Sequence, residues 1–307
     1  MKKTSTIANF NCTFGKNNLP MLTYFKEIVY PAFKSDFTRD VGEDKYFFDE
    51  VKIINKRGRY VLQGILVRKT RLEVKTQYLN GEVKYTNKFY DTAPISIFSL
   101  YLDNHRLIYT TNQKGSPNIR SFSATVRESI KNRVKEYNKD LDKEKRIPHP
   151  TIDIVNIPEK SNIYSKLKKV EKISKLYFKF FIPNGDIETK DAYDWILSEL
   201  DDYGSKSGEL IIKSPTNFST VGKRIEESNG YALVNMEVKY KGGGEGKLDN
   251  SSMTEKFTID VPDGSTIETV ANITLETLNS NAILNKVESE NQKIYNENKR
   301  IISTMVQ

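Results

Sequence analysis

The sequence predicts an α+β fold: an N-terminal antiparallel-sheet domain with a long helix, then a mixed-sheet α+β sandwich domain and a C-terminal helix. Three observations support this class. Short strand-like segments joined by tight turns dominate the first half of the chain, and one long amphipathic helix closes that half. Helix-like and strand-like segments alternate through the second half.

The length of 307 residues suits two domains of ordinary size. A charged stretch over residues 140–146, followed by Pro148 and Pro150, indicates a linker between them. We therefore expect an N-terminal β-rich domain over residues 1–145 that ends in a basic helix, an α+β domain over residues 146–262, and a C-terminal helical segment over residues 263–307.

The first domain is expected to consist mainly of hairpins. Asn80-Gly81 is its strongest turn signal, because both central residues of a type I′ turn need positive φ. A helix over residues 19–33 is expected to break at Pro31. The expected strands cover residues 6–13, 46–55, 60–67, 72–78, 83–90, 95–102 and 107–111.

A long helix is expected over residues 116–141, with Ser116 as its cap and Pro117 in its first turn. Apolar side chains recur along it every three or four residues, which is the spacing of a buried stripe. The stripe consists of Phe122, Val126, Ile130, Val134, Tyr137 and Leu141.

The second domain is expected to have strands over residues 151–157, 173–182, 209–212, 231–240 and 255–261, with helices over 160–170, 191–200 and 218–227. A capping box, Ser265 with Glu268, is expected to open the tail helix, which is expected to break near residues 279–281. Val287, Ile294 and Ile301 are seven residues apart, so the tail either dimerises or packs on its own domain.

Composition excludes several chemistries. One cysteine and two histidines cannot build a structural zinc site, and neither His105 nor His149 lies in a pattern typical of a catalytic triad. No apolar stretch is long enough to span a bilayer, and no apolar run follows the lysines at the start. We expect a cytoplasmic protein that is not an enzyme and that needs no cofactor.

The net charge of +8 favours a polyanionic partner such as nucleic acid, although a proteome rich in lysine would give the same balance. Three basic surfaces carry the candidate DNA-binding residues. Each surface also has the alternative of being a solvated face. The candidates are Arg57, Arg59, Arg68 and Lys75 in the first strands, Arg120, Arg127, Lys131 and Lys135 on the long helix, and Lys175 and Lys179 on the outward side of the strand over 173–182.

The triplet Glu-Val-Lys occurs four times and is half of a metal-nuclease signature. In a strand, however, its Glu and Lys point to the same side and are an ordinary outward pair. A second acid is in reach only for the last copy. A Mg²⁺-dependent nuclease that uses Glu209, Glu237 and Lys239 therefore remains an alternative.

The second half resembles the RexA family in the order of its elements and in several phrases. These include "TIDIVNIP", "VEKISKLYFKFF", "GELIIKSP" and "YALVNMEVKYKGGGEG", and the upstream hairpin "ISIFSLYLDNHRLIYTT" is also similar. The resemblance implies a two-domain, dimeric protein that binds DNA, senses phage DNA–protein complexes and signals to a membrane effector encoded nearby. It implies no enzyme activity.

The sequence thus predicts a sensor for antiphage defence that binds double-stranded DNA without sequence preference. Its expected partners are DNA, a second copy of the chain and a membrane-protein effector. The nuclease, a non-enzymatic adaptor that binds only protein, and an RNA-binding protein remain alternatives.

Overall fold

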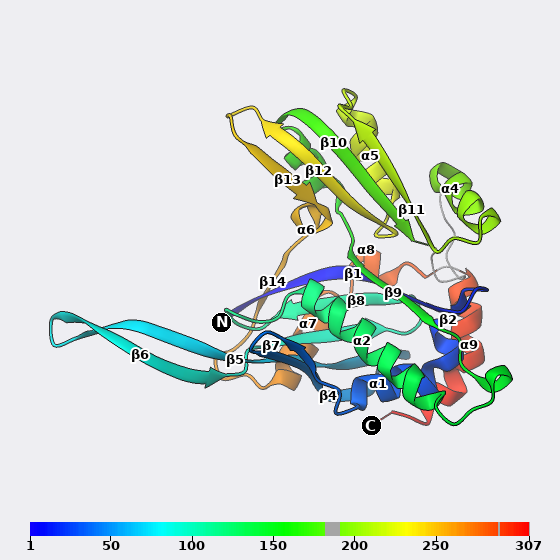
Figure 1. Ribbon diagram of the computed structural model, residues 1–307, viewed down its shortest axis with the longest axis horizontal. Coiled ribbons are helices and arrows are strands. Elements are labelled where there is room, and N and C mark those ends of the chain that lie inside the picture. Colours follow the sequence, from blue (N-terminus) through cyan, green and yellow to red (C-terminus); the bar gives the residue numbers. More distant parts are fainter. Residues whose placement is uncertain (182–190, 288, 307) are drawn as a thin grey trace.

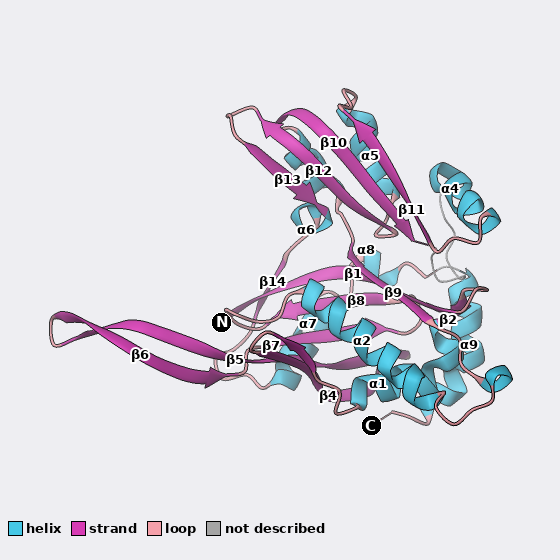
Figure 2. Cartoon of the chain, in the orientation of Figure 1, coloured by secondary structure: helices cyan, strands magenta, loops and turns pink. Residues whose placement is uncertain are grey.

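The computed structural model describes residues 1–181, 191–287 and 289–306. The predicted α+β class is confirmed: helices pack on two sheets whose recorded strand pairs are antiparallel (Figures 1 and 2). The last residue of the strand predicted over 173–182 lies outside the described residues. Within the described ranges, no helix has the length and apolar character needed to cross a bilayer.

The large sheet has ten strands in the order β14-β1-β8-β7-β5-β4-β3, with β2 and β9 paired to β1 and β6 paired to β5. The turn at Asn80-Gly81 has φ of 53° and 85°, as the hairpin signal predicts. The two strands predicted over 60–67 and 72–78 are one strand, β5. The strand bounds are β1 Lys2–Phe14, β2 Leu19–Pro20, β3 Arg39–Val41, β4 Asp44–Lys56, β5 Arg59–Leu79, β6 Glu82–Thr92, β7 Ile95–Tyr101, β8 Arg106–Thr111, β9 Pro150–Asn156 and β14 Phe257–Asp260.

Apolar side chains cover both faces of the large sheet, because alternate residues of each strand point in opposite directions. On β5, Leu62 and Leu66 lie in one core, and Val61 and Ile65 lie in the other. The first core is closed by α1 (Tyr30–Lys34), α2 (Ile119–Tyr137) and α9 (Ser289–Ser303). The second is closed by α7 (Ile267–Thr277) and α8 (Ala282–Asn285).

The helix predicted over 19–33 consists of shorter pieces: β2, a 3-10 turn (Met21–Tyr24), a π turn (Phe25–Val29) and α1. Pro31 lies in the first turn of α1 rather than at a break. A proline lacks the N–H that an interior helical position needs, and the first turn is where this loss costs least. A second 3-10 turn, η3 (Lys143–Lys145), lies in the predicted linker.

The N-cap of α2 lies two residues later than predicted, and the helix begins at Ile119. Asn118 is the N-cap and accepts a hydrogen bond from the Ser121 backbone, whereas the Ser116 hydroxyl donates to the Ile95 carbonyl. The predicted stripe is buried as far as Val134, and Tyr137 is exposed. The cap moves because the tertiary contact of Ser116 competes with local capping.

The segment that forms the small sheet is inserted in the sequence between two strands of the large sheet, β9 and β14. Strands β9 and β14 pair with successive stretches of the same edge of β1, so the chain leaves the large sheet after Asn156 and returns at Phe257. The two connections run side by side, and the Glu159 N–H donates to the Met253 carbonyl. This arrangement differs from the predicted boundaries at 145/146 and 262/263, because β9, β14 and the tail helices all belong to the large sheet's cores.

The small sheet has the order β11-β10-β12-β13, and its pairs are antiparallel rather than mixed as predicted. Helices cover one of its faces and share a core with the inward side chains of β10 and β12. Among the described residues, no helix of this core covers the other face. The bounds are β10 Val170–Phe181, β11 Ser207–Lys213, β12 Ala232–Tyr240, β13 Glu245–Asp249, α3 Lys160–Leu167, α4 Asp191–Asp202, α5 Phe218–Glu227 and α6 Asn250–Met253.

The tail packs on its own sheet. Tyr295 and Ile302 are buried in the first core, and the Tyr295 hydroxyl accepts a hydrogen bond from the Tyr60 backbone at 3.0 Å. Helix α7 is capped by Thr266, not by Ser265, and Glu268 instead forms an ion pair with Lys52 at 2.8 Å. The helix break predicted near residues 279–281 is present, because α7 ends at Thr277 and α8 begins at Ala282.

Candidate nucleic-acid interface

The ten predicted DNA-binding cations form two groups that differ in their position in the fold and in their ion pairs. Four lie along β5 and its flanking turn and hairpin, and six lie on α2 and β10. The first group is scattered, because a strand rises about 3.3 Å per residue and Arg59 and Lys75 are therefore roughly 50 Å apart. In the second group, Arg127 and Lys179 both lie near Asp153 of β9, although 52 residues separate them in the sequence.

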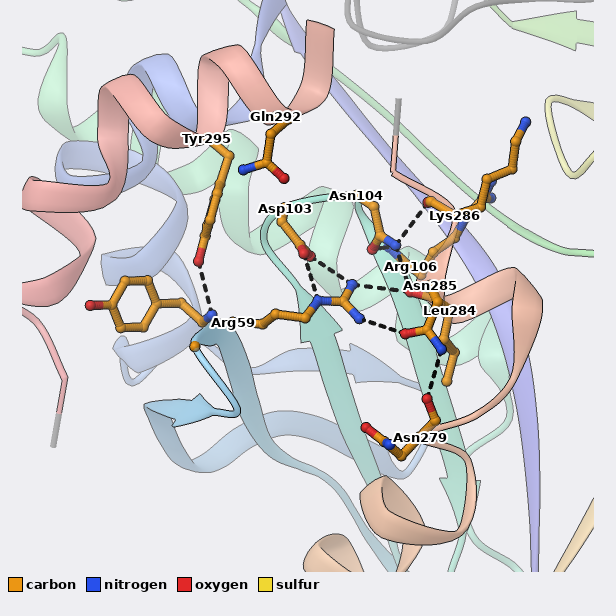
Figure 3. A network of polar contacts seen from close by, with 12 residues as sticks. Arg59, Asp103, Asn104, Arg106, Asn279, Leu284, Asn285, Lys286, Gln292 and Tyr295 are labelled. Atoms are coloured by element: carbon orange, nitrogen blue, oxygen red, sulfur yellow. Dashed lines mark hydrogen bonds and ion pairs between the residues drawn. The ribbon is translucent and has the colours of Figure 1, made fainter. Parts of the chain in front are cut away.

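Arg59 is a structural residue at the centre of a polar network (Figure 3). Its Nε and Nη2 donate to the two carboxylate oxygens of Asp103 at 2.5 and 2.9 Å, and Nη2 also donates to the Leu284 carbonyl at 3.0 Å. The guanidinium lies 4.2 Å from the ring centroid of Tyr101. These contacts connect α8 to the start of β5. The Arg59 side chain therefore stabilises the fold and does not face a ligand.

The other three cations of this group also have carboxylate partners. Arg57 pairs with Glu276 at 2.6 Å, Arg68 pairs with Asp44 at 2.8 Å, and Lys75 pairs with Glu73 at 3.4 Å. The first two acids come from α7 and the start of β4. The predicted basic surface of the first strands is therefore largely neutralised within the chain.

Helix α2 presents its four cations on one face, as the sequence spacing predicts. Arg127 donates to the Ile152 carbonyl at 3.1 Å and approaches Asp153 at 3.7 Å, while Arg120 pairs with Asp249 at 2.9 Å. Further along the helix, Lys131 and Lys135 are exposed and have no ion-pair partner within the described residues. The free positive charge of this face therefore lies towards the end of the helix.

Strand β10 has the predicted alternation. Phe178 and Phe180 are buried against the helices, and Lys175 and Lys179 lie on the opposite, uncovered face. Lys175 lies opposite Lys213 of β11 and Glu237 of β12, and Glu237 in turn lies opposite Lys247 of β13. Three lysines and one glutamate thus form a row across all four strands of this face.

The uncovered face of the small sheet and α2 form two walls of one cleft. A pocket of about 360 Å³ is lined by Arg120 and Arg127 from α2, by residues 153–156 of β9, and by Leu233, Asn235 and Asp249 of the small sheet. In Figure 1 the small sheet stands above α2, with β9 running between them. Arg120 and Arg127 therefore line this cleft, and Lys179 lies close enough to act on Asp153 within it.

Asp153 lies in this cleft between the charges of Arg127 and Lys179. Burial raises the pKa of its carboxyl group above the usual range, and the two neighbouring cations partly offset that rise. A carboxylate at this position lowers the positive potential of the cleft. Protonation of Asp153 would therefore make the cleft more cationic.

The residues of the nuclease alternative do not come together. Glu209 lies opposite Lys179, and Glu237 lies opposite Lys175 on the other side of β10, so their Cα atoms are roughly 16 Å apart. Lys239 pairs instead with Glu171 at 3.2 Å. Among the residues that the structure describes, no group of three or more His, Cys, Asp or Glu side chains is placed to hold a metal ion.

Sequence reasoning missed four residues of this surface: Asp153, Lys213, Lys247 and Asp249. Lys213 could have been found, since it ends a strand whose alternation places it beside Lys175. Lys247 belongs to β13, and the sequence pattern did not predict this strand because a glycine-rich loop precedes it. The two aspartates carried no local signal, because their importance comes from the packing of β9 and β13 near α2.

In comparisons with protein-family models and with curated proteins, nothing matches this chain. The resemblance to the RexA family therefore remains a prediction that rests on the quoted sequence phrases.

Proposed function

We propose that this protein binds double-stranded DNA without sequence preference, through the cationic surface formed by α2 and the uncovered face of the small sheet. One observation carries the proposal: Arg127 of α2 and Lys179 of β10, which are distant in sequence, both lie near Asp153 in the cleft beside α2. Lys131 and Lys135 extend one wall, and the row containing Lys175, Lys213 and Lys247 extends the other.

The chemistry of this surface suits a phosphate backbone. Lysine and arginine side chains neutralise phosphates and release counterions, which gives affinity that does not depend on base sequence. Asp153 and Asp249 oppose binding and would set its strength, since each already holds one arginine of α2.

The biological role that we propose is sensing in antiphage defence, with a signal passed to a membrane-protein effector. This part of the proposal rests on the resemblance of the chain to the RexA family. DNA would be captured electrostatically by a dimer, and a conformational or oligomeric change would follow. A neighbouring gene that encodes several transmembrane helices, and whose product co-purifies with this chain only when DNA is present, would support it.

Binding is tested by fluorescence anisotropy of a labelled duplex, with and without Mg²⁺, over a series of salt concentrations. We expect affinity that falls steeply with salt, does not require Mg²⁺ and leaves the duplex intact on a gel. A labelled RNA hairpin of equal length serves as the comparison, and tighter binding to it would favour RNA.

Two outcomes would overturn the proposal. Absence of binding at low salt would leave a protein-binding adaptor. Mg²⁺-dependent cutting that Glu237→Ala abolishes would establish the nuclease. Glu209→Ala is the matched variant, because a shared site would need both carboxylates and the separation of these two predicts no shared role.

A further inference from the structure

The distal part of β5 and β6, residues 70–92, extends from the large sheet as a two-stranded ribbon (Figure 1). Strand β5 pairs with β7 only as far as Val67 and with β4 only as far as Lys69. Beyond those residues its recorded strand partner is β6. An isolated two-stranded ribbon is at best marginally stable in water, so such a ribbon normally needs something to pack against.

The pairing register sorts the ribbon's side chains onto two different faces. Directly opposed residues share a face, and the pairs Leu72 with Tyr90 and Tyr78 with Val83 lie on one side, together with Tyr85. The intervening positions form the other face, which is mixed and charged. Its pairs are Arg71 with Asp91, Glu73 with Phe89, Gln77 with Lys84 and Leu79 with Glu82.

The first of these faces, which we name the ribbon's apolar face, is solvent-exposed in the single chain. The exposed fractions are 90% for Tyr85, 73% for Tyr78, 63% for Val83 and 55% for Leu72. Large apolar side chains that are exposed together on one face of a monomer normally mark an interaction site. Its location on an element that the fold does not otherwise support indicates that the covered state is the functional one.

The charges of the ribbon indicate a protein partner rather than nucleic acid. Lys88 is the charged residue on the apolar face, opposite Val74, and the ribbon's other charges, of both signs, lie on the mixed face. A nucleic-acid surface would carry its cations beside the aromatic side chains. Apart from Lys88, whose long side chain can reach the edge of the contact, this face has no charge that packing on an identical face would bury.

The area also suits a second copy of this chain. Aromatic side chains bury 150–250 Å² each, so the exposed residues of the apolar face offer roughly 600 Å² per chain. Two such faces would together bury roughly 1,200 Å², which is the lower limit for a specific interface. A twofold axis makes one self-complementary patch sufficient for both subunits.

We propose that the ribbon's apolar face is a dimerisation surface on which the ribbons of two chains pack face to face. The tyrosines form the centre of the contact, and their hydroxyl groups reach its rim. The mixed face, with Arg71, Glu73 and Lys84, stays in water. This proposal stands independently of DNA binding, because none of its residues belongs to the cationic cleft.

The test is the molar mass in solution, measured by light scattering after size exclusion at several protein concentrations. The variant Tyr78→Thr/Val83→Thr/Tyr85→Thr removes apolar area and keeps strand-forming residues. We expect the wild type to be a dimer and the variant a monomer with the same thermal unfolding of the two sheets. The matched variant Glu73→Thr/Gln77→Thr/Lys84→Thr changes the mixed face and should remain dimeric.

A second measurement keeps the proposal testable if the triple variant misfolds. The only cysteine, Cys12, is buried and burial raises the pKa of its thiol, so it reacts poorly. A short bismaleimide should therefore cross-link Thr76→Cys, on the apolar face, and leave Gln77→Cys, on the mixed face, uncross-linked.

Three results would overturn the proposal. One is a wild type that is monomeric at tens of micromolar. Another is a dimer that survives the apolar-face variant but is lost on Ile301→Ser, which would place dimerisation on α9. The third is a wild-type monomer that binds vesicles of phosphatidylcholine and phosphatidylglycerol through Tyr78 and Tyr85, which would make the ribbon a membrane-binding arm.

Discussion

The basic residues of β5 and those of α2 and β10 look alike in sequence but have different roles in the structure. In β5 and the turn before it, Arg57, Arg59 and Arg68 each meet a carboxylate supplied by a segment elsewhere in the fold. On the second surface, Lys131, Lys135 and Lys175 have no ion-pair partner within the described ranges. Local charge density therefore shows where cations are, whereas the fold decides which of them remain available to a ligand.

The largest expected effect is on stability and concerns Arg59, one of the paired arginines of the first surface. Arg59→Ala leaves Asp103, which is only 4% exposed, buried without its partner. We expect a loss of about 3 kcal/mol in the free energy of unfolding, measured by urea denaturation, because an unpaired buried charge is costly. The folded variant should bind DNA as the wild type does. A large loss of DNA affinity in protein shown to be folded would instead return Arg59 to the interface.

The second prediction concerns the β10 wall. Lys175→Glu/Lys179→Glu reverses two charges on the uncovered face of the small sheet, and we expect duplex affinity to fall at least about tenfold in 0.1 M salt. The matched variant is Lys160→Glu/Lys223→Glu, which reverses two lysines on α3 and α5, on the other side of that sheet. Equal losses in the two variants would mean that only net charge matters.

A smaller effect, of opposite sign, is expected from Asp153→Asn. The substitution removes a carboxylate between Arg127 and Lys179, so duplex affinity at pH 7 should rise a few-fold. Because the pKa of Asp153 is raised, the wild-type carboxylate becomes protonated at a higher pH than an ordinary aspartate. The difference between the two proteins should therefore shrink as the pH falls towards that raised pKa. Unchanged affinity at every pH would remove Asp153 from the interface.

Much of the fold could be predicted from alternation and turn chemistry alone. The Asn80-Gly81 turn, the inward Phe178 and Phe180, and the buried stripe of α2 all follow from local patterns that the tertiary structure preserves. The cap of α2 and the membership of β9 could not be predicted this way. Both depend on contacts between segments far apart in sequence, namely Ser116 with Ile95 and β9 with β1.

For the candidate site, too, local patterns were predictable from the sequence and contacts between distant segments were not. Spacing alone placed Arg127, Lys131 and Lys175 on common faces of their own elements, and the structure keeps them there. It could not indicate that Arg127 of α2 and Lys179 of β10 both lie near Asp153, or that Asp103 and Glu276 neutralise the arginines of the first strands. Partners of this kind are fixed by topology, which no short stretch of sequence encodes.

The most direct test of this account is the salt dependence of duplex binding in two variants that each remove two cations. Lys131→Gln/Lys135→Gln takes them from α2, and Lys52→Gln/Arg57→Gln takes them from side chains already paired with Glu268 and Glu276. Each lost phosphate contact should lower the slope of log affinity against log salt by about 0.9. We predict a slope shallower by about two for the α2 variant and an unchanged slope for the other. Equal slopes in both variants would contradict the claim that, of these two surfaces, the second is the one that the fold leaves free to bind DNA.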